Sequence, residues 1–521
     1  MKTNNALFSR QSAAGFLGFL AWSFVFAVIY AQSPLYTSNQ HQYFLHGLAR
    51  VGYGYLEHDW LAQTLDPLPL FSALVSLGYR LSPSGLLFYA CYALLLGVYL
   101  LAALGIVEEV FGRRQDPEWQ AVFLILFLIL HSALLRYVLS SFLGVPDPFL
   151  LEGGVAGQRL LGQVLQPSVF GVFLVLSIYL FLRGHIIPCL LALATAISFH
   201  SVYLLTGGLL VLAYVWMTFR STRSAFAALR IGITSLVLVA PSLAYTLHVF
   251  RPTSSRVIAE VNELLVNFRN PHHAIVVEWF GWTVIAKTAI VLAALLVLRR
   301  SRLLPILATL AAGSAALTIC QLVTDSNTLA LLYPWRVSVL LVPLSSCVLV
   351  AYALTKALDR LGSIRQHAAR WARLLAAVVF TVLIAVGAIR FYVERSRQQT
   401  ESARPMMGYV AAHASPQDIY LIPPSMEDFR LNAGAAAFVD FKSVPYRDTD
   451  VLEWYRRVTL AQWFYRDRIE YVDCGLLERF AAEYGVTHVV LDQPLLELTC
   501  PAFGEQLFRN SHYAVVRLRR P

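Results

Sequence analysis

The chain has 521 residues, of which 57% are hydrophobic and only 14% are charged, and its mean hydropathy is +0.60. A typical soluble domain carries about 25% charged residues, so this composition excludes a protein that is soluble throughout. The net charge of +10 does not indicate nucleic-acid binding, because the basic excess lies in residues 1–393, with 26 Lys/Arg against 14 Asp/Glu, whereas residues 394–521 hold 15 against 17.

Residues 1–393 consist of long apolar runs separated by short polar loops. A membrane-spanning helix needs about 20 mainly apolar residues, and on this basis we predict eleven spans, near 15–31, 84–107, 119–142, 167–183, 186–199, 203–219, 229–250, 277–298, 303–322, 335–355 and 374–393. The run 186–219 is too long for one helix, so we divide it at His200 and Ser201. The first run has no small-residue cleavage site, so we expect it to be retained as a helix.

The loops on the two sides of these spans differ in charge. Loops on the side of the N-terminus hold 16 Lys and Arg residues, and loops on the opposite side hold 7. Because basic loops remain in the cytoplasm, we place the N-terminus inside, and an odd number of spans places the C-terminal segment outside. The predicted fold is mostly α, a polytopic helical bundle of about 11 transmembrane helices in a bacterial inner membrane, with a small periplasmic C-terminal α/β domain.

Residues 394–521 have the composition of a soluble domain and follow the transmembrane domain, residues 1–393, which includes an outer loop at 32–83. We predict helices at 403–414, 450–468 and 475–484 and strands at 418–422, 435–440, 487–491 and 513–518. This alternation indicates a small α/β sheet. No common nucleotide, metal or redox motif occurs, so the domain has no cofactor fingerprint. A disulfide between Cys474 and Cys500 fits an oxidising compartment, although the sequence does not show that they meet.

The first outer loop carries a cluster of ionisable residues just beyond the first span. Glu57, His58 and Asp59 are consecutive, and Asp66 follows seven residues later. Carboxylates close to lipid are costly and are therefore functional candidates. Shielding from water raises the pKa of a carboxyl group, which suits a general base. The alternative is a loop whose acids face water, with Asp66 capping a helix.

Two further outer segments combine arginine with histidine or aromatic residues. Arg269 is followed by His272 and His273, and Arg336 follows an aromatic pair at the start of the tenth span. A guanidinium group can hold a phosphate through two hydrogen bonds, so we consider these residues candidate phosphate contacts. The alternatives are a polar Asn-Pro turn for the first segment and an arginine beside a lipid headgroup for the second.

Gln158 and Arg159, in the loop before the fourth span, supply donors that suit a sugar or a phosphate, or that cap the helix. His200 lies at the break between two short helices, where a hydrogen-bonded packing role is the alternative to a functional one. Arg136 and Lys287 lie within spans, so we expect each to have a partner, most simply on another helix.

These segments together resemble the GT-C superfamily of polytopic membrane glycosyltransferases, in a poorly characterised bacterial branch. The acidic cluster lies where the family has its first-loop acidic motif, and three further stretches look like segments of such proteins: Gln166-Pro167-Ser168-Val169-Phe170-Gly171, Pro334-Trp335-Arg336-Val337-Ser338, and Phe429-Arg430 through Phe438-Val439-Asp440-Phe441-Lys442-Ser443-Val444-Pro445. The soluble domain lacks the WWD-type motif of the oligosaccharyltransferase branch, so we do not expect protein N-glycosylation.

The resemblance implies transfer of a sugar from a polyprenyl-phosphate-linked donor in the membrane to a cell-envelope glycan or lipid acceptor, with inversion at the anomeric carbon. It assigns catalysis to the loop acids Asp59, Glu57 and Asp66, with Asp59 as the base. It assigns substrate or lipid-phosphate contacts to His58, Arg159, His200, Arg269, His272, His273 and Arg336. A divalent metal is compatible with this chemistry but not required, because the leaving group is already a stable phosphate.

Three other functions fit the same sequence. A polysaccharide polymerase or ligase would depend on Arg269 and His272 more than on Asp59. A lipid-linked glycan transporter, or flippase, would place polar residues at the centre of the bilayer and on both sides, whereas here they gather outside. A catalytically inactive scaffold would tolerate substitution at every one of these positions.

Overall fold

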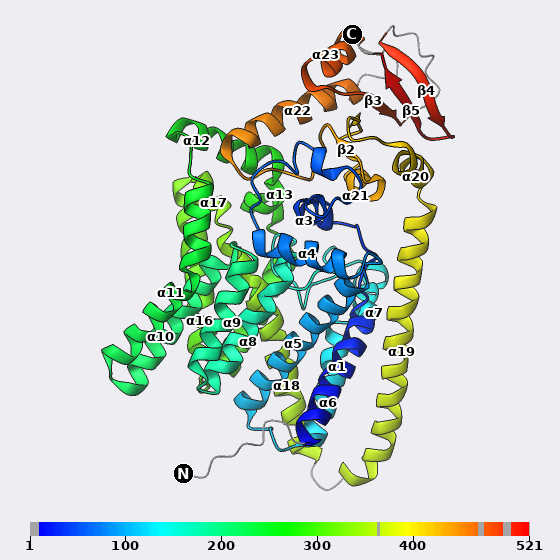
Figure 1. The fold of residues 1–521 in the computed structure, drawn as a ribbon. Coiled ribbons are helices and arrows are strands. Elements are labelled where there is room, and N and C mark those ends of the chain that lie inside the picture. The colour runs from blue at the N-terminus through cyan, green and yellow to red at the C-terminus, as the bar shows by residue number, and fades with distance from the viewer. Residues whose placement is uncertain (1–9, 362–364, 467–473, 493–501, 520–521) are drawn as a thin grey trace. The chain divides into compact units, whose positions relative to one another are not determined.

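The computed structural model describes residues 10–361, 365–466, 474–492 and 502–519 (Figure 1). Packing divides the chain into two compact units, which we describe separately. The first unit comprises Met1–Gln32, Tyr89–Leu243 and Leu265–Tyr392, and the second comprises Ser33–Phe88, Ala244–Leu264 and Val393–Pro521.

The secondary structure of the first unit's described residues is helical, with no strand. Its helices are α1 (Arg10–Tyr30), α5 (Leu86–Phe111), α6 (Pro117–Leu130), α7 (Ala133–Tyr137), η2 (Val138–Phe142), η3 (Pro167–Gly171), α8 (Val172–Leu182), α9 (Ile186–Phe199), α10 (Tyr203–Thr222), α11 (Ala225–Val249), η4 (Leu265–Arg269), α13 (Pro271–Ala274), α14 (Val276–Trp279), α15 (Trp282–Val297), α16 (Leu304–Thr324), α17 (Asn327–Leu331), η5 (Pro334–Val337), α18 (Ser338–Leu361) and α19 (Arg365–Thr400). Among the described residues, six helices are long and apolar enough to cross a membrane, or seven if the bent pair formed by α6 with α7 and η2 is one span. The chain is therefore a multi-pass membrane protein.

Polar residues interrupt two of the apolar runs. The predicted span 119–142 is broken between α6 and α7 and bends by 41°. A new helix, α7, begins after Ser132. The hydroxyl of Ser132 caps this helix by accepting a hydrogen bond from the backbone N–H of Leu135 at 3.0 Å. The predicted break at His200 is also present, since α9 ends at Phe199 and α10 begins at Tyr203.

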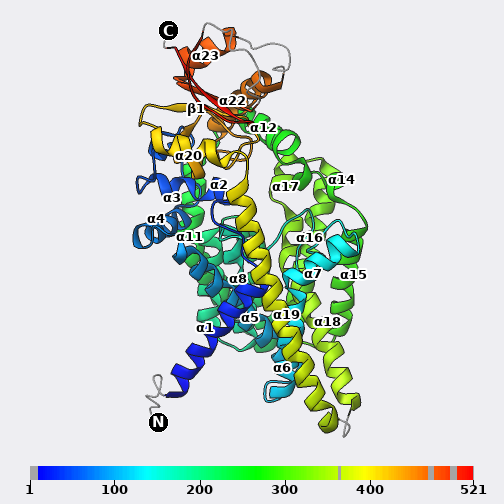
Figure 2. The same ribbon diagram turned by 90° about the vertical axis from the view of Figure 1, so that its right-hand side faces the viewer.

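Close helix crossings shape the bundle of the first unit. Helices α15, α16 and α18 lie against one another (Figure 2), and α8 packs on α9 as an antiparallel pair (Figure 1). Helix α19 approaches α1 at Gly387, where an added Cβ atom would lie 2.0 Å from the carbonyl oxygen of Val28. Only glycine allows this crossing.

The second unit contains short helices and one sheet. Its elements are α2 (Gln40–Tyr43), α3 (Leu45–Ala49), η1 (Leu56–His58), α4 (Pro69–Leu81), α12 (Ser255–Leu264), α20 (Arg404–His413), β1 (Ile419–Leu421), α21 (Phe429–Ala433), β2 (Ala436–Ala437), α22 (Asp448–Arg466), α23 (Cys474–Tyr484), β3 (His488–Leu491), β4 (Phe503–Arg509) and β5 (Ala514–Leu518). The strand order is β2-β1-β3-β5-β4. Strand β1 pairs in parallel with β2 and β3, whereas β5 pairs antiparallel with β3 and β4.

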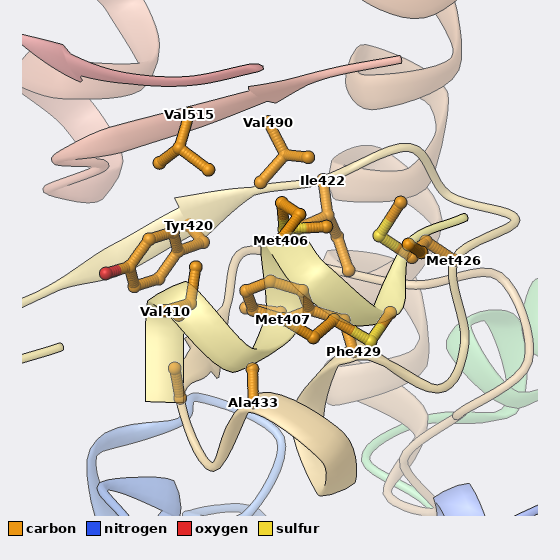
Figure 3. Close-up of a cluster of buried hydrophobic side chains, with 13 residues drawn as sticks. Met406, Met407, Val410, Tyr420, Ile422, Met426, Phe429, Ala433, Val490 and Val515 are labelled. Atoms are coloured by element: carbon orange, nitrogen blue, oxygen red, sulfur yellow. The ribbon is translucent and has the colours of Figure 1, made fainter. Parts of the chain in front are cut away.

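An apolar cluster joins α20 and α21 to this sheet. Met406, Met407 and Val410 of α20 face Tyr420 of β1 and Val490 of β3 in its interior (Figure 3). Each of these residues is buried. Burying such side chains stabilises a fold by about 1.5–3 kcal/mol each, so this cluster is the core of the C-terminal domain.

The first loop belongs to the same compact unit as this domain. The backbone N–H of Tyr55 donates to the carbonyl of Gly434 at 2.7 Å, and the hydroxyl of Tyr53 donates to the carbonyl of Leu431 at 2.9 Å. Gly54 and Gly434 both have positive φ, and a Cβ atom on Gly54 would lie 2.1 Å from the carbonyl oxygen of Gly434. Two glycines therefore make this contact possible.

The predicted fold class is confirmed: the chain is mostly α, with many apolar helices and a small C-terminal α/β sheet. The eleven predicted spans all fall on helical segments of the described residues; one of them, 119–142, is broken, and four fall on helices shorter than a full span. The predicted pair Cys474–Cys500 includes a residue outside the described ranges, so it remains a prediction.

Candidate functional site

Asp59, in the first loop of the second unit, is fully buried and hydrogen bonded at both oxygens. One oxygen accepts from the backbone N–H of Leu61 at 2.9 Å, and the other accepts from Nε of Arg430 at 2.6 Å and the N–H of Ala437 at 2.9 Å. Arg430 also forms an ion pair with buried Asp440. Burial alone would lower the pKa of Arg430, and the two carboxylates more than offset it, so the pKa is raised. This cluster joins the first loop to the C-terminal domain.

Asp66 occupies a different setting in the same unit. Its side chain is 8% exposed and forms an ion pair with the half-exposed Arg50 at 2.6 Å, while its other oxygen accepts from the N–H of Leu68 at 2.9 Å. The hydroxyl of Tyr245 donates to its backbone carbonyl at 2.6 Å. Asp66 also lines a cavity of about 20 Å³ together with His46. The carboxylate is thus both held in place and close to a small cavity.

Glu57 and His58 lie on the surface of the second unit. Their side chains are 55% and 43% exposed, and they contact each other at 3.4 Å. An ion pair in this setting contributes little to stability. The two residues are accessible to a ligand but are not held by buried partners.

The loop 143–166 of the first unit is fixed by two ion pairs of buried cations. Arg136 donates to Glu152 at 2.9 Å and to the carbonyl of Tyr30. Lys287 donates to Asp147 and to the carbonyl of Gly154, each at 2.5 Å. Arg136 and Lys287 thus have partners, as predicted; their carboxylates come from the loop, and Arg136 also bonds to Tyr30 at the end of helix α1. Breaking a buried pair typically costs about 3–5 kcal/mol, so the loop is rigidly held.

This loop and the start of α15 enclose a cavity of about 290 Å³. Its walls carry two cations, Arg159 and Lys287, and the carboxylate of Asp147. Trp279, Gln158 and Thr283 also contribute polar groups to its lining. The backbone turns sharply beside it at Ala156 and Gly157, both with positive φ. The cavity is large enough for a ligand rather than a single water molecule.

Two hydrogen-bond donors of this cavity have no acceptor among the described residues. The side-chain oxygen of Gln158 accepts from Nε of Arg336 at 2.7 Å, which fixes the orientation of the amide. The Nε2 atom of Gln158 is then buried and unbonded, and the same holds for Nε1 of Trp279. A buried donor without a partner costs about 1–3 kcal/mol. These donors favour a ligand rich in hydrogen-bond acceptors.

The cations of this region are not all neutralised. Within the described part of the chain, neither Arg159 nor Arg336 forms an ion pair with a carboxylate. Arg159 instead lies over the ring of Phe149, with its guanidinium carbon 3.8 Å from the ring centre, and Arg336 lies over Tyr333 at 5.3 Å. The region around the cavity therefore keeps a positive charge that an anion would neutralise.

The predicted histidines and Arg269 also belong to the first unit. Nδ1 of His273 donates to the carbonyl of Ala156 at 2.7 Å, and Arg269 donates to Asn270 at 3.2 Å. Burial, and then the charge of Arg336, lowers the pKa of His200 to about 3. Burial, and then His272, lowers the pKa of His273 to about 4, and burial and Arg269 lower that of His272. Near neutral pH these rings are uncharged, so the positive charge comes from arginine.

The structure thus brings together residues far apart in the sequence. Arg159 and Arg336 flank Gln158 within the first unit, and His273 is bonded to the same loop. The predicted residues of the second unit separate into buried Asp59, cavity-lining Asp66, and the exposed pair Glu57 and His58. Within the described residues, no three His, Cys, Asp or Glu side chains are arranged to hold a metal ion.

Sequence-based reasoning missed several of these partners. It did not identify Arg430 and Asp440 as partners of Asp59, although both lie in a stretch that suggested the family. It also missed Trp279 and His46. An arginine in a soluble domain gives no signal of its burial, so only the Gly-rich stretch 153–157 offered a local hint of a tight turn beside a ligand.

Fold and site together define a multi-pass helical membrane protein with a C-terminal α/β domain and a basic, donor-rich cavity. Residues 401–461, which include Arg430 and Asp440, match a family model described as a domain of unknown function, DUF6798. No curated protein matches the chain. Among solved structures, the chain is similar to the crystal structure of ArnT from Cupriavidus metallidurans bound to undecaprenyl phosphate, with 13% identity, a TM-score of 0.46, and coverage of 97% of this chain and 98% of that one. A similarity this distant does not define what this chain binds or does.

Proposed function

We propose that the protein is a membrane glycosyltransferase of the GT-C kind, which transfers a sugar from a polyprenyl-phosphate-linked donor to a cell-envelope glycan or lipid acceptor. The observation that carries the proposal is the cavity of the first unit, with Arg159 and Lys287 in its walls and unbonded donors on Gln158 and Trp279. The resemblance of the sequence to the GT-C superfamily supports the same activity. The lipid would remain in the membrane while its phosphate enters this cavity.

The charges of the cavity suit the chemistry of the donor. A sugar phosphodiester carries one negative charge, and the departing lipid phosphate gains a second one when the sugar–oxygen bond breaks. Cations positioned in advance stabilise charge that develops in the transition state. Arg159 is the cation of the cavity that no described carboxylate neutralises. We assign Arg159 the role of binding the leaving phosphate. Further lipid-phosphate contacts are assigned to Arg336, Arg269, His200, His272 and His273.

The first loop of the second unit supplies the acid–base chemistry in this proposal. Asp59, Glu57 and Asp66 are its candidates, with His58 as a substrate contact. The geometry of Asp66 suits the acid–base chemistry better than that of Asp59, because Asp66 lines a small cavity while every oxygen of Asp59 accepts a hydrogen bond from the protein. Glu57 is accessible but has no fixed position. We therefore assign the required carboxylate to Asp66.

The location of the reaction follows from the charge asymmetry of the loops. With basic loops in the cytoplasm, the C-terminal domain and the first loop lie in the periplasm of a bacterial inner membrane. Reporter fusions at the C-terminus test this orientation. Alkaline phosphatase activity is the expected result, and fluorescence of a cytoplasmic reporter would overturn the assignment.

The activity itself is tested in proteoliposomes with a panel of undecaprenyl-phosphate-linked radiolabelled hexoses and pentoses, and with envelope lipid extract as acceptor. The wild-type protein should transfer label to the extract. Arg159→Ala should lower transfer by about tenfold or more, since a charge-assisted hydrogen bond contributes about 1.5–3 kcal/mol. Arg220→Ala, on the exposed end of α10, is the matched control. Movement of the donor across the bilayer without transfer would instead favour the flippase alternative.

A further inference from the structure

A small cavity of the second unit is lined by a histidine, His46, that no motif identified. The cavity measures about 20 Å³ and is lined by His46 and Asp66, with Ser72 and Gln42 nearby in its walls. A space of this size accommodates one water molecule or one hydroxyl group. It is too small for a sugar ring, so it suits the single reacting hydroxyl of a larger molecule.

The hydrogen bonding of His46 fixes its tautomer. Nδ1 lies 3.2 Å from the carbonyl oxygen of Ala62. A carbonyl only accepts, so Nδ1 carries the proton and donates it. In the neutral ring Nε2 is then the lone-pair acceptor, and no described residue bonds to it. His46 therefore offers an unused proton acceptor in a residue that lines the cavity.

The position of His46 is set by close packing of α3 on α4. A Cβ atom on Gly47, the next residue, would lie 2.7 Å from the carbonyl oxygen of Ser72 and 2.6 Å from Val75. The hydroxyl of Ser76 donates to the carbonyl of Gly47 at 2.8 Å. The packing of Gly47 on α4 fixes the backbone beside His46, and the hydrogen bond to Ala62 fixes its ring.

The charges that face His46 are those of Asp66, Asp59 and Arg50. Burial lowers the pKa of His46; the two carboxylates act to raise it, and Arg50 acts to lower it. The net direction is downward, so the ring is neutral at neutral pH. Asp66, held by Arg50, stabilises the ring once it gains a proton. A neutral ring that becomes a cation beside a fixed carboxylate has the arrangement of a general base.

We propose that His46 takes the proton from the acceptor hydroxyl through its Nε2 atom, and that Asp66 is its counter-charge. This inference rests on the proposed glycosyl transfer. The acceptor oxygen would occupy the cavity shared by the two side chains. Asp66 is then required for the reaction without itself receiving the proton.

The proposed transfer is a single displacement at the anomeric carbon of the donor. The acceptor oxygen forms a bond to the anomeric carbon of the donor as its proton moves to Nε2 of His46. The bond between that carbon and the phosphate oxygen breaks, and the lipid phosphate leaves with the bonding electrons. His46 returns its proton to water when the product departs. No oxidant, reductant or further reactant is needed.

The test compares His46→Asn with wild type over pH 5 to 9, using the labelled undecaprenyl-phosphate sugars and envelope lipid extract. The amide nitrogen of asparagine retains the donation to Ala62 but cannot take up a proton. We expect kcat to fall about 100- to 10,000-fold, as for loss of a general base, with unchanged KM for the donor. His413→Asn is the control, because exposed His413 makes the same kind of bond, from Nδ1 to the carbonyl of Tyr409 at 2.8 Å.

The pH profile separates a catalytic role from a structural one. Wild-type kcat should fall with decreasing pH only below the ordinary histidine value of about 6.5, because burial lowers the pKa of His46. Asp66→Asn removes a charge that raises the pKa of His46, so the remaining activity should lose its acid limb or show it at lower pH. A His46→Asn enzyme with wild-type kcat and the same acid limb would overturn the inference. Wild-type protein without transfer activity would instead overturn the proposed function.

Discussion

At the scale of single residues, the environment of a carboxylate separates groups that look alike in the sequence. Asp59 and Asp66 are seven positions apart in one loop, yet Asp59 is completely enclosed by protein donors and Asp66 borders a cavity. A buried carboxylate with full hydrogen bonding holds structure together, whereas a carboxylate beside a cavity can act on a ligand. The two residues should therefore respond to substitution in different ways.

The cluster of Asp59, Arg430 and Asp440 leads to a stability prediction. Arg430→Gln leaves two buried carboxylates without a cation, so the second unit should lose on the order of 3–5 kcal/mol. Asp59→Asn keeps one acceptor oxygen and leaves Arg430 paired with Asp440, so it should cost less. Thermal unfolding in detergent measures both. Arg479→Gln, which breaks an exposed pair with Glu483 at 2.9 Å, is the control and should change stability by less than about 1 kcal/mol.

The relative losses of stability in Arg430→Gln, Asp59→Asn and Arg479→Gln decide between a structural and a catalytic role for the cluster. Equal stability of Arg430→Gln and Arg479→Gln would contradict a structural role for the buried cluster. Full stability of Asp59→Asn combined with complete loss of transfer would return the role of base to Asp59.

At the scale of elements, glycines determine how the first loop meets the C-terminal domain. Gly52 and Gly54 both have positive φ, but only Gly54 faces another backbone, that of Gly434. Alanine at either position is strained by about 1–2 kcal/mol, and at Gly54 it adds a steric clash, typically about 1–3 kcal/mol. Gly54→Ala should therefore lower the melting temperature more than Gly52→Ala.

Limited proteolysis provides a second measurement of this contact. We expect the loop of Gly54→Ala to be cleaved faster than that of Gly52→Ala, because its docking on the domain is weakened. Equal melting temperatures and equal cleavage rates for the two variants would show that the backbones do not meet at this point.

Elements were also what the sequence predicted best. Long apolar runs with polar breaks indicate helices directly, so the predicted spans fall on helical segments and the break at His200 is present, although six or seven helices of the described residues are long and apolar enough to cross a membrane. Strands β1, β3 and β5 agree for the same reason, since each is a short apolar run between turns. Strand β4 was missed, because Phe503–Arg509 is mixed in polarity; among the described strands it pairs with β5, at the edge of the sheet. The bend at Ser132 was also missed, because one serine within an apolar run usually continues the helix.

The site could be predicted only in part, because its pairings are long-range. The sequence identified Arg159, Arg336 and His273 as polar groups in outer loops, yet nothing in it shows that Arg336 bonds to a side chain 178 positions away. It identified Asp59 as a candidate base but not its buried partner Arg430, 371 positions away. Burial and pairing are properties of the folded chain, and residue types alone do not reveal them.

At the scale of the whole molecule, the residues with proposed roles belong to two compact units. The first unit consists of apolar helices around a basic cavity, and the second joins the first loop to the C-terminal domain. In the proposed function, the first unit recognises the phosphate of a lipid, and the second prepares the acceptor hydroxyl. Each activity is therefore open to measurement on its own in the intact protein.

Binding of undecaprenyl phosphate to the purified full-length protein, followed by native mass spectrometry, tests the central claim most directly. Wild type and Arg220→Ala should bind the lipid equally. Arg159→Ala should bind at least about tenfold more weakly, because it removes the cation of the cavity that no described carboxylate neutralises. Equal binding by Arg159→Ala and wild type would contradict the assignment of this cavity to the lipid phosphate.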